Sequence, residues 1–215
     1  MTLIGDFLIG ANPAAPELTG VMMVDMFRDA AGNSDLRMVL GGMLGAVGIS
    51  FTGVGYFQIY QLLKNQKGVM PFIYWLSALM YIGLAGAGTH LNCAAIPMLY
   101  KWIAASDLQL AVSVTEKYAY YFMMPLTILF GVLLLAALVY QTVIIGRGKT
   151  AYPKHAVFYN MVFGVIAAYA VAAIVGNNVV GNGIGTGAIS MGHMWMFGMM
   201  LLKRPEAYRI PEEKM

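Results

Sequence analysis

The sequence predicts an all-α integral membrane protein, built as a bundle of about five transmembrane helices. Of its 215 residues, 60% are hydrophobic and only 11% are charged, whereas a soluble domain carries about 25% charged residues. Several apolar runs reach or approach the ~20 residues that a helix needs to cross a bilayer. Glycines recur at helical spacing within these runs, which is typical of helices that pack closely in membranes.

Composition and motif spacing exclude several other classes of protein. The single cysteine, Cys93, excludes an internal disulfide and a paired-cysteine metal or redox site. The three histidines are too far apart for a metalloprotease motif, and no phosphate-binding glycine loop follows a strand-like run. The 13 basic residues are dispersed, so we expect no nucleic-acid surface. The start of the chain lacks a basic region, so we expect no cleavable signal peptide.

Residues 1–38 are predicted to form an acidic, partly helical segment that lies against the bundle on the outer side of the membrane. Its apolar runs, 3–11 and 21–27, are too short to span a bilayer. The letters GDFLIG near its start could alternatively be the end of a further span, which would make six. The acidic residues of this segment are Asp6, Glu17, Asp25, Asp29 and Asp35.

The first predicted span, Val39–Leu63, has a stripe of small residues along one face. Residues three or four apart share a face of a helix, and small side chains let a second helix approach closely. We therefore expect a helix–helix partner to pack on this stripe. Its glycines are Gly41, Gly45, Gly48 and Gly55.

The second predicted span lies within 69–102 and is longer than a bilayer is thick. At ~1.5 Å per residue it exceeds a ~30 Å hydrocarbon core. We expect it to tilt, to project from the membrane, or to break near Asn92 and Pro97. His90 shares a helical face with small residues, which places it in a groove rather than against lipid. A short polar linker, 104–117, is predicted to follow.

Three more spans complete the predicted bundle, which occupies residues 39–202. The third, Tyr118–Ile145, begins with tyrosines typical of a membrane interface. The fourth is His155–Gly176, and the fifth ends at Leu202. The letters GNNVVGNG between the last two spans are uncharged and rich in Gly and Asn, which predicts a tight turn or an unwound stretch.

The basic residues predict how the bundle is oriented. Lys and Arg near span ends favour the cytoplasmic side, and here they follow the first, third and fifth spans. We expect the N-terminus outside, a cytoplasmic tail at 203–215, and a multi-pass location in the plasma (inner) membrane. The basic residues concerned are Lys64, Lys67, Arg147, Lys149, Lys154, Lys203 and Arg204.

The last apolar run, Gly176–Leu202, carries a stripe of polar residues. Asn182, Thr186, Ser190 and His193 follow one another at steps of four, four and three, so they share one face of a helix. We expect an outward-opening pocket between the second, fourth and fifth spans, with His193 at its floor and Asn182 at its mouth. The other predicted ligand-binding residues, near the outer boundary, are His90, Asn92, Asn177 and Asn178.

Two kinds of chemistry at this pocket remain open. Ser190 and His193 could form a nucleophile and its base, but a triad also needs an acid, and only Asp6 or Asp25 could supply it. Alternatively, His90 and His193 could ligate a haem or a metal ion from two helices, although we estimate their heights to differ by ~15 Å. The sequence identifies no cofactor, and we predict no metal site.

Three functions are compatible with this pattern. The first is a pocket that binds a small or lipid-like ligand from the outer side or outer leaflet, with or without turnover. The second is a carrier or channel, which would need polar residues through the full depth of the membrane. The third is a structural or accessory subunit of a membrane complex that packs its glycine faces against partners.

The chain resembles small bacterial multi-span proteins of unknown function. The resemblance lies in GDFLIG near the start, in LRMVLGGMLGAVG leading the first span, and in a single histidine in a late span. It implies a polytopic membrane protein and no particular activity. It also favours the alternative in which the first residues belong to a shortened first span.

Overall fold

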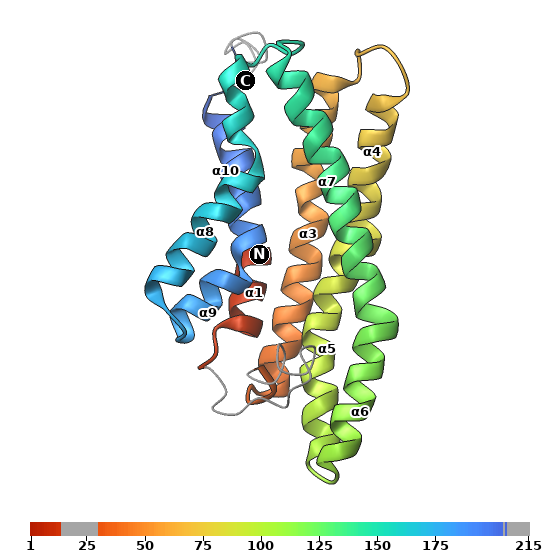
Figure 1. Cartoon of the computed structure of the whole chain (residues 1–215), viewed down its shortest axis with the longest axis vertical. Coiled ribbons are helices and arrows are strands. Elements are labelled where there is room, and N and C mark those ends of the chain that lie inside the picture. Colours follow the sequence, from red (N-terminus) through yellow and green to blue (C-terminus); the bar gives the residue numbers. More distant parts are fainter. Residues whose placement is uncertain (14–29, 204, 206–215) are drawn as a thin grey trace, which may run out of the picture.

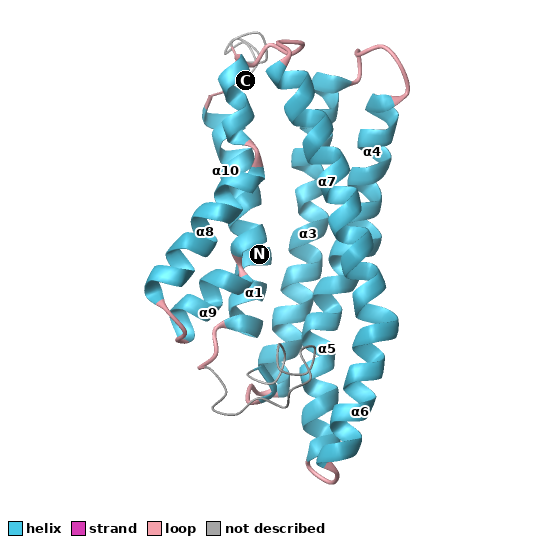
Figure 2. Cartoon of the chain, viewed as in Figure 1, coloured by secondary structure: helices cyan, strands magenta, loops and turns pink. Residues whose placement is uncertain are grey.

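The computed structural model describes residues 1–13, 30–203 and 205, and every regular element within them is a helix (Figure 2). The all-α prediction is therefore confirmed. Part of the predicted acidic segment, 14–29, and nearly all of the predicted cytoplasmic tail, 203–215, lie outside the described residues.

Three long antiparallel runs of helix form one side of the molecule (Figure 1). Within the described part of the chain, these three are long and apolar enough to cross a membrane, judged by length and composition. Three of the five predicted spans thus have a full-length helix. The runs are α3 (Asp35–Leu63), then α4 (Met70–Met80) with η1 (Tyr81–Gly86) and α5 (Ala87–Ala104), then α6 (Leu108–Tyr118) with η2 (Ala119–Met123) and α7 (Met124–Gly146).

The last two predicted spans are shorter and form the other side of the molecule (Figure 1). They comprise η3 (Lys154–Tyr159), α8 (Met161–Val175), α9 (Val179–Thr186) and α10 (Ala188–Leu202). The helices α8 and α10 pack against each other, and each has 15 residues, or ~22 Å. The helix is interrupted at Gly187, between α9 and α10, so the residues of the expected polar stripe do not lie on one continuous helix.

The predicted polar linker 104–117 is mostly helical instead. Its turn is confined to 105–107, where the Asp107 carboxylate accepts a hydrogen bond from the Leu110 N–H (2.9 Å) and caps α6. The helix α6 then continues through the π-helical η2 into α7. Pro125 lies in the first turn of α7, and the widened π turn accommodates a ring that lacks an N–H and crowds the preceding turn. The α5–α6 hairpin extends beyond the end of α3 (Figure 1).

A short N-terminal helix, α1 (Thr2–Gly10), packs against α3, α9 and α10. Its contact with α3 is backbone against backbone, because a Cβ on Gly5 would lie 2.6 Å from the Gly41 carbonyl oxygen. A Cβ on Gly48 would likewise overlap Thr2. The first helix therefore packs within the bundle, and the location of residues 1–38 on the outer side of the membrane stays a prediction.

The rest of the glycine stripe also faces helices of this chain. A Cβ on Gly45 would overlap the His90 imidazole of α5, and one on Gly55 would lie 2.4 Å or more from the Phe197 ring of α10. The small-residue face of α3 therefore packs against α1, α5 and α10 of the same molecule.

Side chains from α3 and α9 hold the C-terminal end of α1. The Arg37 guanidinium donates hydrogen bonds to the carbonyls of Leu8 (2.7 Å) and Ala11 (2.9 Å). Asn182 donates through its Nδ2 to the carbonyl of Asn12 (2.8 Å). The last carbonyls of a helix have no partner within it, so these bonds fix α1 in place.

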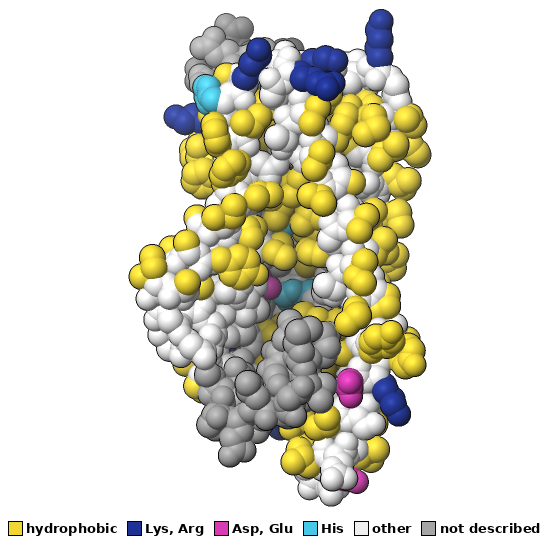
Figure 3. All heavy atoms as spheres, in the orientation of Figure 1, with side chains coloured by type: hydrophobic (Ala, Val, Ile, Leu, Met, Phe, Trp, Pro, Cys, Tyr) yellow, Lys and Arg dark blue, Asp and Glu magenta, His cyan; other side chains and the backbone are white. Residues whose placement is uncertain are grey.

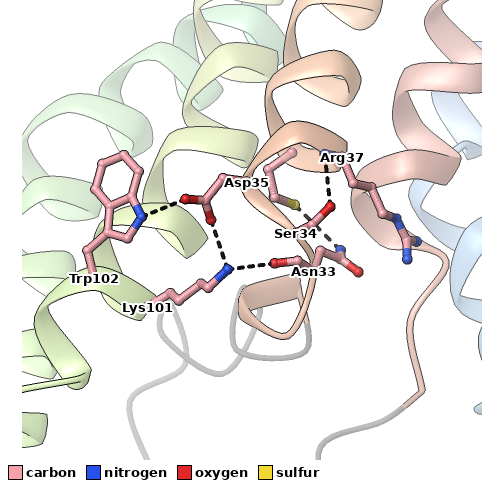
Figure 4. Close-up of polar contacts among 7 residues, drawn as sticks. Asn33, Ser34, Asp35, Arg37, Lys101 and Trp102 are labelled. Carbon is pink, nitrogen blue, oxygen red and sulfur yellow. Dashed lines mark hydrogen bonds and ion pairs between the residues drawn. The ribbon is translucent and has the colours of Figure 1, made fainter.

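The residues that precede α3 are tied to the end of α5 (Figure 4). Lys101 donates to the Asn33 carbonyl (3.0 Å) and to the Asp35 carboxylate (2.8 Å), and the Trp102 indole N–H donates to the same carboxylate (3.0 Å). Arg37 follows in the first turn of α3, so this network also positions the guanidinium that holds α1.

In the described part of the chain, basic side chains without nearby acids concentrate at one end of the molecule. Figure 3 shows Lys and Arg gathered at the end that carries the α3–α4 and α7–η3 connections. The described basic residues there are Lys64, Lys67, Arg147, Lys149, Lys154 and Lys203. Among the described acids, Asp6 lies in the bundle, and Asp35, Asp107 and Glu116 lie toward the opposite end.

Candidate functional site

A cavity of about 580 Å³ lies between α1, α3, α5, α7 and α10. Figure 3 shows it as a hollow on the side of the molecule, with an acidic and a histidine side chain visible at its bottom. We call it the lateral cavity. Its apolar lining includes Leu3, Ile9, Ile49, Phe130, Ile189, Phe197 and Leu201, and its polar lining includes Asp6, Thr89, His90, Ser190 and His193.

The first polar group in the lateral cavity is the Asp6 cluster, formed by Asp6, His90 and Ser190. The Asp6 side chain comes from α1, and one of its carboxylate oxygens accepts a hydrogen bond from the Ser190 hydroxyl of α10. The other oxygen lies 3.4 Å from Nδ1 of His90 on α5. All three residues are buried, with 5–8% of their surface exposed. One carboxylate therefore links three helices that are distant in sequence.

The contacts of His90 restrict where protons can lie in the Asp6 cluster. Its Nε2 lies 3.2 Å from the Gly41 carbonyl oxygen, which can only accept, so Nε2 carries a proton. The contact between Nδ1 and Asp6 then needs one more proton, either on the imidazole as an ion pair or on the carboxyl group as a neutral pair. Both arrangements satisfy the same atoms, so the proton can be shared across this contact.

The second polar group is the His193 cluster, formed by His193, Tyr56, Tyr81 and Phe197. Nδ1 of His193 lies 3.0 Å from the Ile189 carbonyl oxygen and must donate to it. In the neutral ring, Nε2 is then an acceptor, and the hydroxyls of Tyr56 (2.9 Å) and Tyr81 (3.1 Å) lie within donating distance.

Aromatic packing surrounds this imidazole. The Tyr81 ring stacks on it at 5.7 Å between centroids, the Tyr56 ring meets it edge-on at 5.8 Å, and Phe197 lies 5.7 Å away. Tyr56 and Tyr81 are at most 1% exposed. With no carboxylate among its contacts, His193 is a neutral hydrogen-bond acceptor in an aromatic pocket.

Four of the eight predicted site residues line the lateral cavity. His193 and Ser190 come from α10, His90 from α5 and Thr186 from α9. The described lining residues include none from α8, whereas the fourth predicted span was expected to form one wall. The helices α1, α3 and α7 take its place.

The other four predicted site residues do not line the lateral cavity. Asn92 accepts a hydrogen bond from the Tyr118 hydroxyl (2.9 Å) and faces α6. Asn178 caps α9 by accepting from the N–H groups of Val180 and Gly181, and its neighbour Asn177 is exposed. Asn182 donates to the backbone of the N-terminal segment. The interruption at Gly187 accounts for Asn182, because it turns the start of α9 away from the face of α10 while Thr186, at the end of α9, still lines the cavity.

The arrangement around Ser190 differs from the expected serine–histidine pair. Both ring nitrogens of His193 face other groups, and the Ser190 hydroxyl binds the Asp6 carboxylate. Asp6 is thus one of the two acids expected to reach this site, but it contacts the serine directly and orients His90 rather than His193. The second acid, Asp25, lies outside the described residues.

The two histidines also differ from a pair of axial ligands. Each has both nitrogens within bonding distance of protein groups, so neither presents a free nitrogen to an iron or metal ion in this arrangement. Among the described residues, no three His, Cys, Asp or Glu side chains are grouped so as to hold a metal ion.

Comparison with known proteins gives one match. A model of a family of unknown function, DUF6796, matches residues 1–206. The chain belongs to this family. Searches among curated proteins and among solved structures found no match. Membership in DUF6796 confirms the expected likeness to proteins of unknown function and brings no activity, substrate or cofactor with it.

The DUF6796 match covers residues 1–206 and so includes every residue of both polar clusters. Sequence reasoning missed Tyr56 and Tyr81, because a tyrosine in an apolar run has the same pattern as any packing residue. A usable signal was present for Tyr56, since it follows the stripe glycine Gly55 and so lies next to the face that packs other helices.

Proposed function

We propose that this protein is a multi-pass membrane protein whose lateral cavity binds a lipid-like molecule. The observation that carries the proposal is a cavity of about 580 Å³ that combines apolar walls with buried ionisable groups and opens on the side of the helix bundle (Figure 3). Pockets for small ligands usually measure about 300–1,000 Å³ and join an apolar lining with a few placed polar groups.

The proposed topology has five embedded segments, with the N-terminus outside and the C-terminus in the cytoplasm of a plasma (inner) membrane. Three segments are the full-length helices, and the fourth and fifth are α8 and the α9–α10 pair. Side chains exposed on α8 are apolar, including Ile166, Val171 and Ile174, as lipid contact requires. The basic end of the molecule would face the cytoplasm under the positive-inside rule.

The position of the opening favours a ligand that arrives from the bilayer. Met194 and Leu201 of α10 line the cavity and are 62% and 70% exposed, and the lining residues Thr127 and Phe130 lie on α7 across from them. In a membrane, apolar side chains at such an entrance would meet acyl chains. A lipid-like molecule could enter laterally without crossing water.

The polar floor would bind the polar end of that molecule. Ser190 and His90 lie next to the Asp6 carboxylate, and the proton that Asp6 and His90 can share would allow the cluster to accept or to donate. The buried Thr89 hydroxyl lines the same cavity and has no partner among the described residues. Buried polar groups without partners are costly, so a bound hydroxyl, amide or ester would complete this floor.

The test is to fill the cavity without disturbing the helices. Gly198 lines the cavity, and a Cβ built there meets nothing within 4 Å. Gly198→Phe should therefore occupy the ligand space, while Gly131→Phe, at an equally open position on α7 that does not line the cavity, is the matched control. Protein would be purified in mild detergent, extracted with organic solvent and examined by mass spectrometry for stoichiometric lipids or other small molecules.

We expect a molecule that co-purifies with wild type and with Gly131→Phe. Its amount should fall at least about tenfold in Gly198→Phe, because each ~1.4 kcal/mol of lost binding free energy lowers the affinity about tenfold. If the same lipids accompany all three proteins in equal amounts, the proposal is wrong.

A further inference from the structure

A second pocket, of about 440 Å³, lies at the basic end of the molecule. It opens between the α3–α4 connection and the C-terminal end of α7, and it shares no described lining residue with the lateral cavity. We call it the basic pocket. Its lining residues are Asn65, Gln66, Lys67, Met70, Tyr140, Ile144, Arg147 and Lys149.

The two loops that form the basic pocket are joined to each other. Nε2 of Gln66 donates to the Lys149 carbonyl (2.9 Å) across a large sequence separation. The Lys149 N–H donates to the Ile144 carbonyl (3.1 Å), closing the end of α7. Gly148 makes this turn with φ +67°, in a region that favours glycine. Lys149 is thus held opposite the loop that carries Lys67.

Three cationic side chains line this pocket, and no carboxylate of the described residues pairs with them. They are Lys67, Arg147 and Lys149, and all three are exposed. No acid is among the described lining residues. Like charges grouped in one concave site repel one another, and an anion between them removes that repulsion.

The surroundings of the pocket favour a lipid as the source of the anion. Val69, Met70 and Phe72 at the start of α4 are 61%, 44% and 61% exposed, so an apolar surface begins at the rim of a cationic site. This is the arrangement that an anionic phospholipid needs, with the phosphate on the cations and the acyl chains along the helix. Basic pockets between helices at the cytoplasmic surface are suited to such head groups.

We propose that the basic pocket binds the phosphate group of an anionic phospholipid through Lys67, Arg147 and Lys149. Arg147 offers a planar fork that matches two phosphate oxygens, and the two lysines add point charges. The bound lipid would fix the α3–α4 and α7–η3 connections against each other at the proposed cytoplasmic surface.

The experiment measures binding of phosphatidylglycerol, phosphatidylcholine and inorganic phosphate to detergent-purified protein by native mass spectrometry. The test variant combines Lys67→Gln, Arg147→Gln and Lys149→Gln, and it keeps the Lys149 carbonyl that binds Gln66. The matched control is Lys117→Gln, which removes an exposed lysine at the opposite end. If the triple variant fails to fold, Lys149→Gln alone replaces it, and wild type is also measured at 0.1 M and 1 M salt.

We expect wild type and Lys117→Gln to prefer phosphatidylglycerol over phosphatidylcholine. The triple variant should lose roughly 100-fold in phosphatidylglycerol affinity, because each cation contributes roughly a fivefold factor near an anionic group. Lys149→Gln alone should lose roughly fivefold, and 1 M salt should weaken wild-type binding because it shortens screening to about 3 Å.

Displacement of phosphatidylglycerol by inorganic phosphate at millimolar concentration would assign the pocket to a soluble phosphate ion and overturn the lipid as its occupant. Equal binding of the two lipids by wild type would overturn the proposal. So would undiminished binding by the glutamine variants.

Discussion

The Asp6 cluster and the His193 cluster lie in the same cavity, yet they use histidine in opposite ways. His90 contacts a carboxylate that is also bound by Ser190, whereas His193 contacts two tyrosine hydroxyls and a backbone carbonyl. Ser190 and His193 are neighbours on one face of α10, so a single helical turn separates the two environments. The partner contributed by the other helices, rather than the histidine itself, decides what each can do.

This difference separates a group that can respond to a ligand from one that supports the fold. Two proton arrangements satisfy the contact between Asp6 and His90, and a bound molecule that donates or accepts would favour one of them. The neutral His193 ring has one arrangement that satisfies its contacts, with Nδ1 donating and Nε2 accepting. We therefore expect variants of the two clusters to differ in both stability and ligand retention.

The largest effect should come from removing the carboxylate of the Asp6 cluster. Asp6→Leu leaves His90 and Ser190 buried without their common partner, and removing one member of a buried ionic contact costs about 3–5 kcal/mol. Unfolding titrations in mixed detergent micelles would measure the loss. Asp6→Asn, which keeps an oxygen acceptor for Ser190, should lose clearly less. Equal stability of wild type and Asp6→Leu would show that the carboxylate is not a structural partner of α5 and α10.

A smaller loss is expected from the centre of the His193 cluster. His193→Leu places an apolar side chain of similar volume at this position, but it leaves the hydroxyls of Tyr56 and Tyr81 without their shared acceptor. A buried donor left unsatisfied costs about 1–3 kcal/mol, and the same titrations would detect it. His155→Leu, at an exposed histidine in η3, is the control and should be neutral. A larger loss for His193→Leu than for Asp6→Leu would reverse the ranking of the two clusters.

Much of the bundle could be predicted because hydrophobic length and helix signals are local properties of the chain. The ends of α3 and α7 lie within a few residues of the predicted spans, since charged loops and capping residues bound the apolar runs. The break at Gly187 was not predictable in the same way. The letters GNGIGTGAIS are compatible with one continuous helix, and only packing of α9 against α1 and α8 sets where it bends.

The candidate site was predictable on α10 and not beyond it. Ser190 and His193 stand out because polar side chains in an apolar run are costly unless they have partners. Their partners come from α1, α3 and η1. Asp6 and Ser190 are 184 positions apart in the sequence, so no local pattern predicts their contact. The glycine stripe of α3 did indicate a close helix contact, but it could not identify α1 as the helix that fills it.

The smallest effects should distinguish the two donors to His193. Tyr56→Phe and Tyr81→Phe each remove one hydroxyl while keeping the ring contacts, so each should cost about 0.5–1.5 kcal/mol, the usual net worth of one hydrogen bond. Because both hydroxyls share one acceptor, the double variant should lose less stability than the sum of the losses in the two single variants. Nitrogen-15 NMR of labelled histidine should show His193 protonated at Nδ1 in wild type and in both variants, since the bond to Ile189 persists. A signal for the Nε2-protonated form would contradict the acceptor role of His193 and remove its contrast with His90.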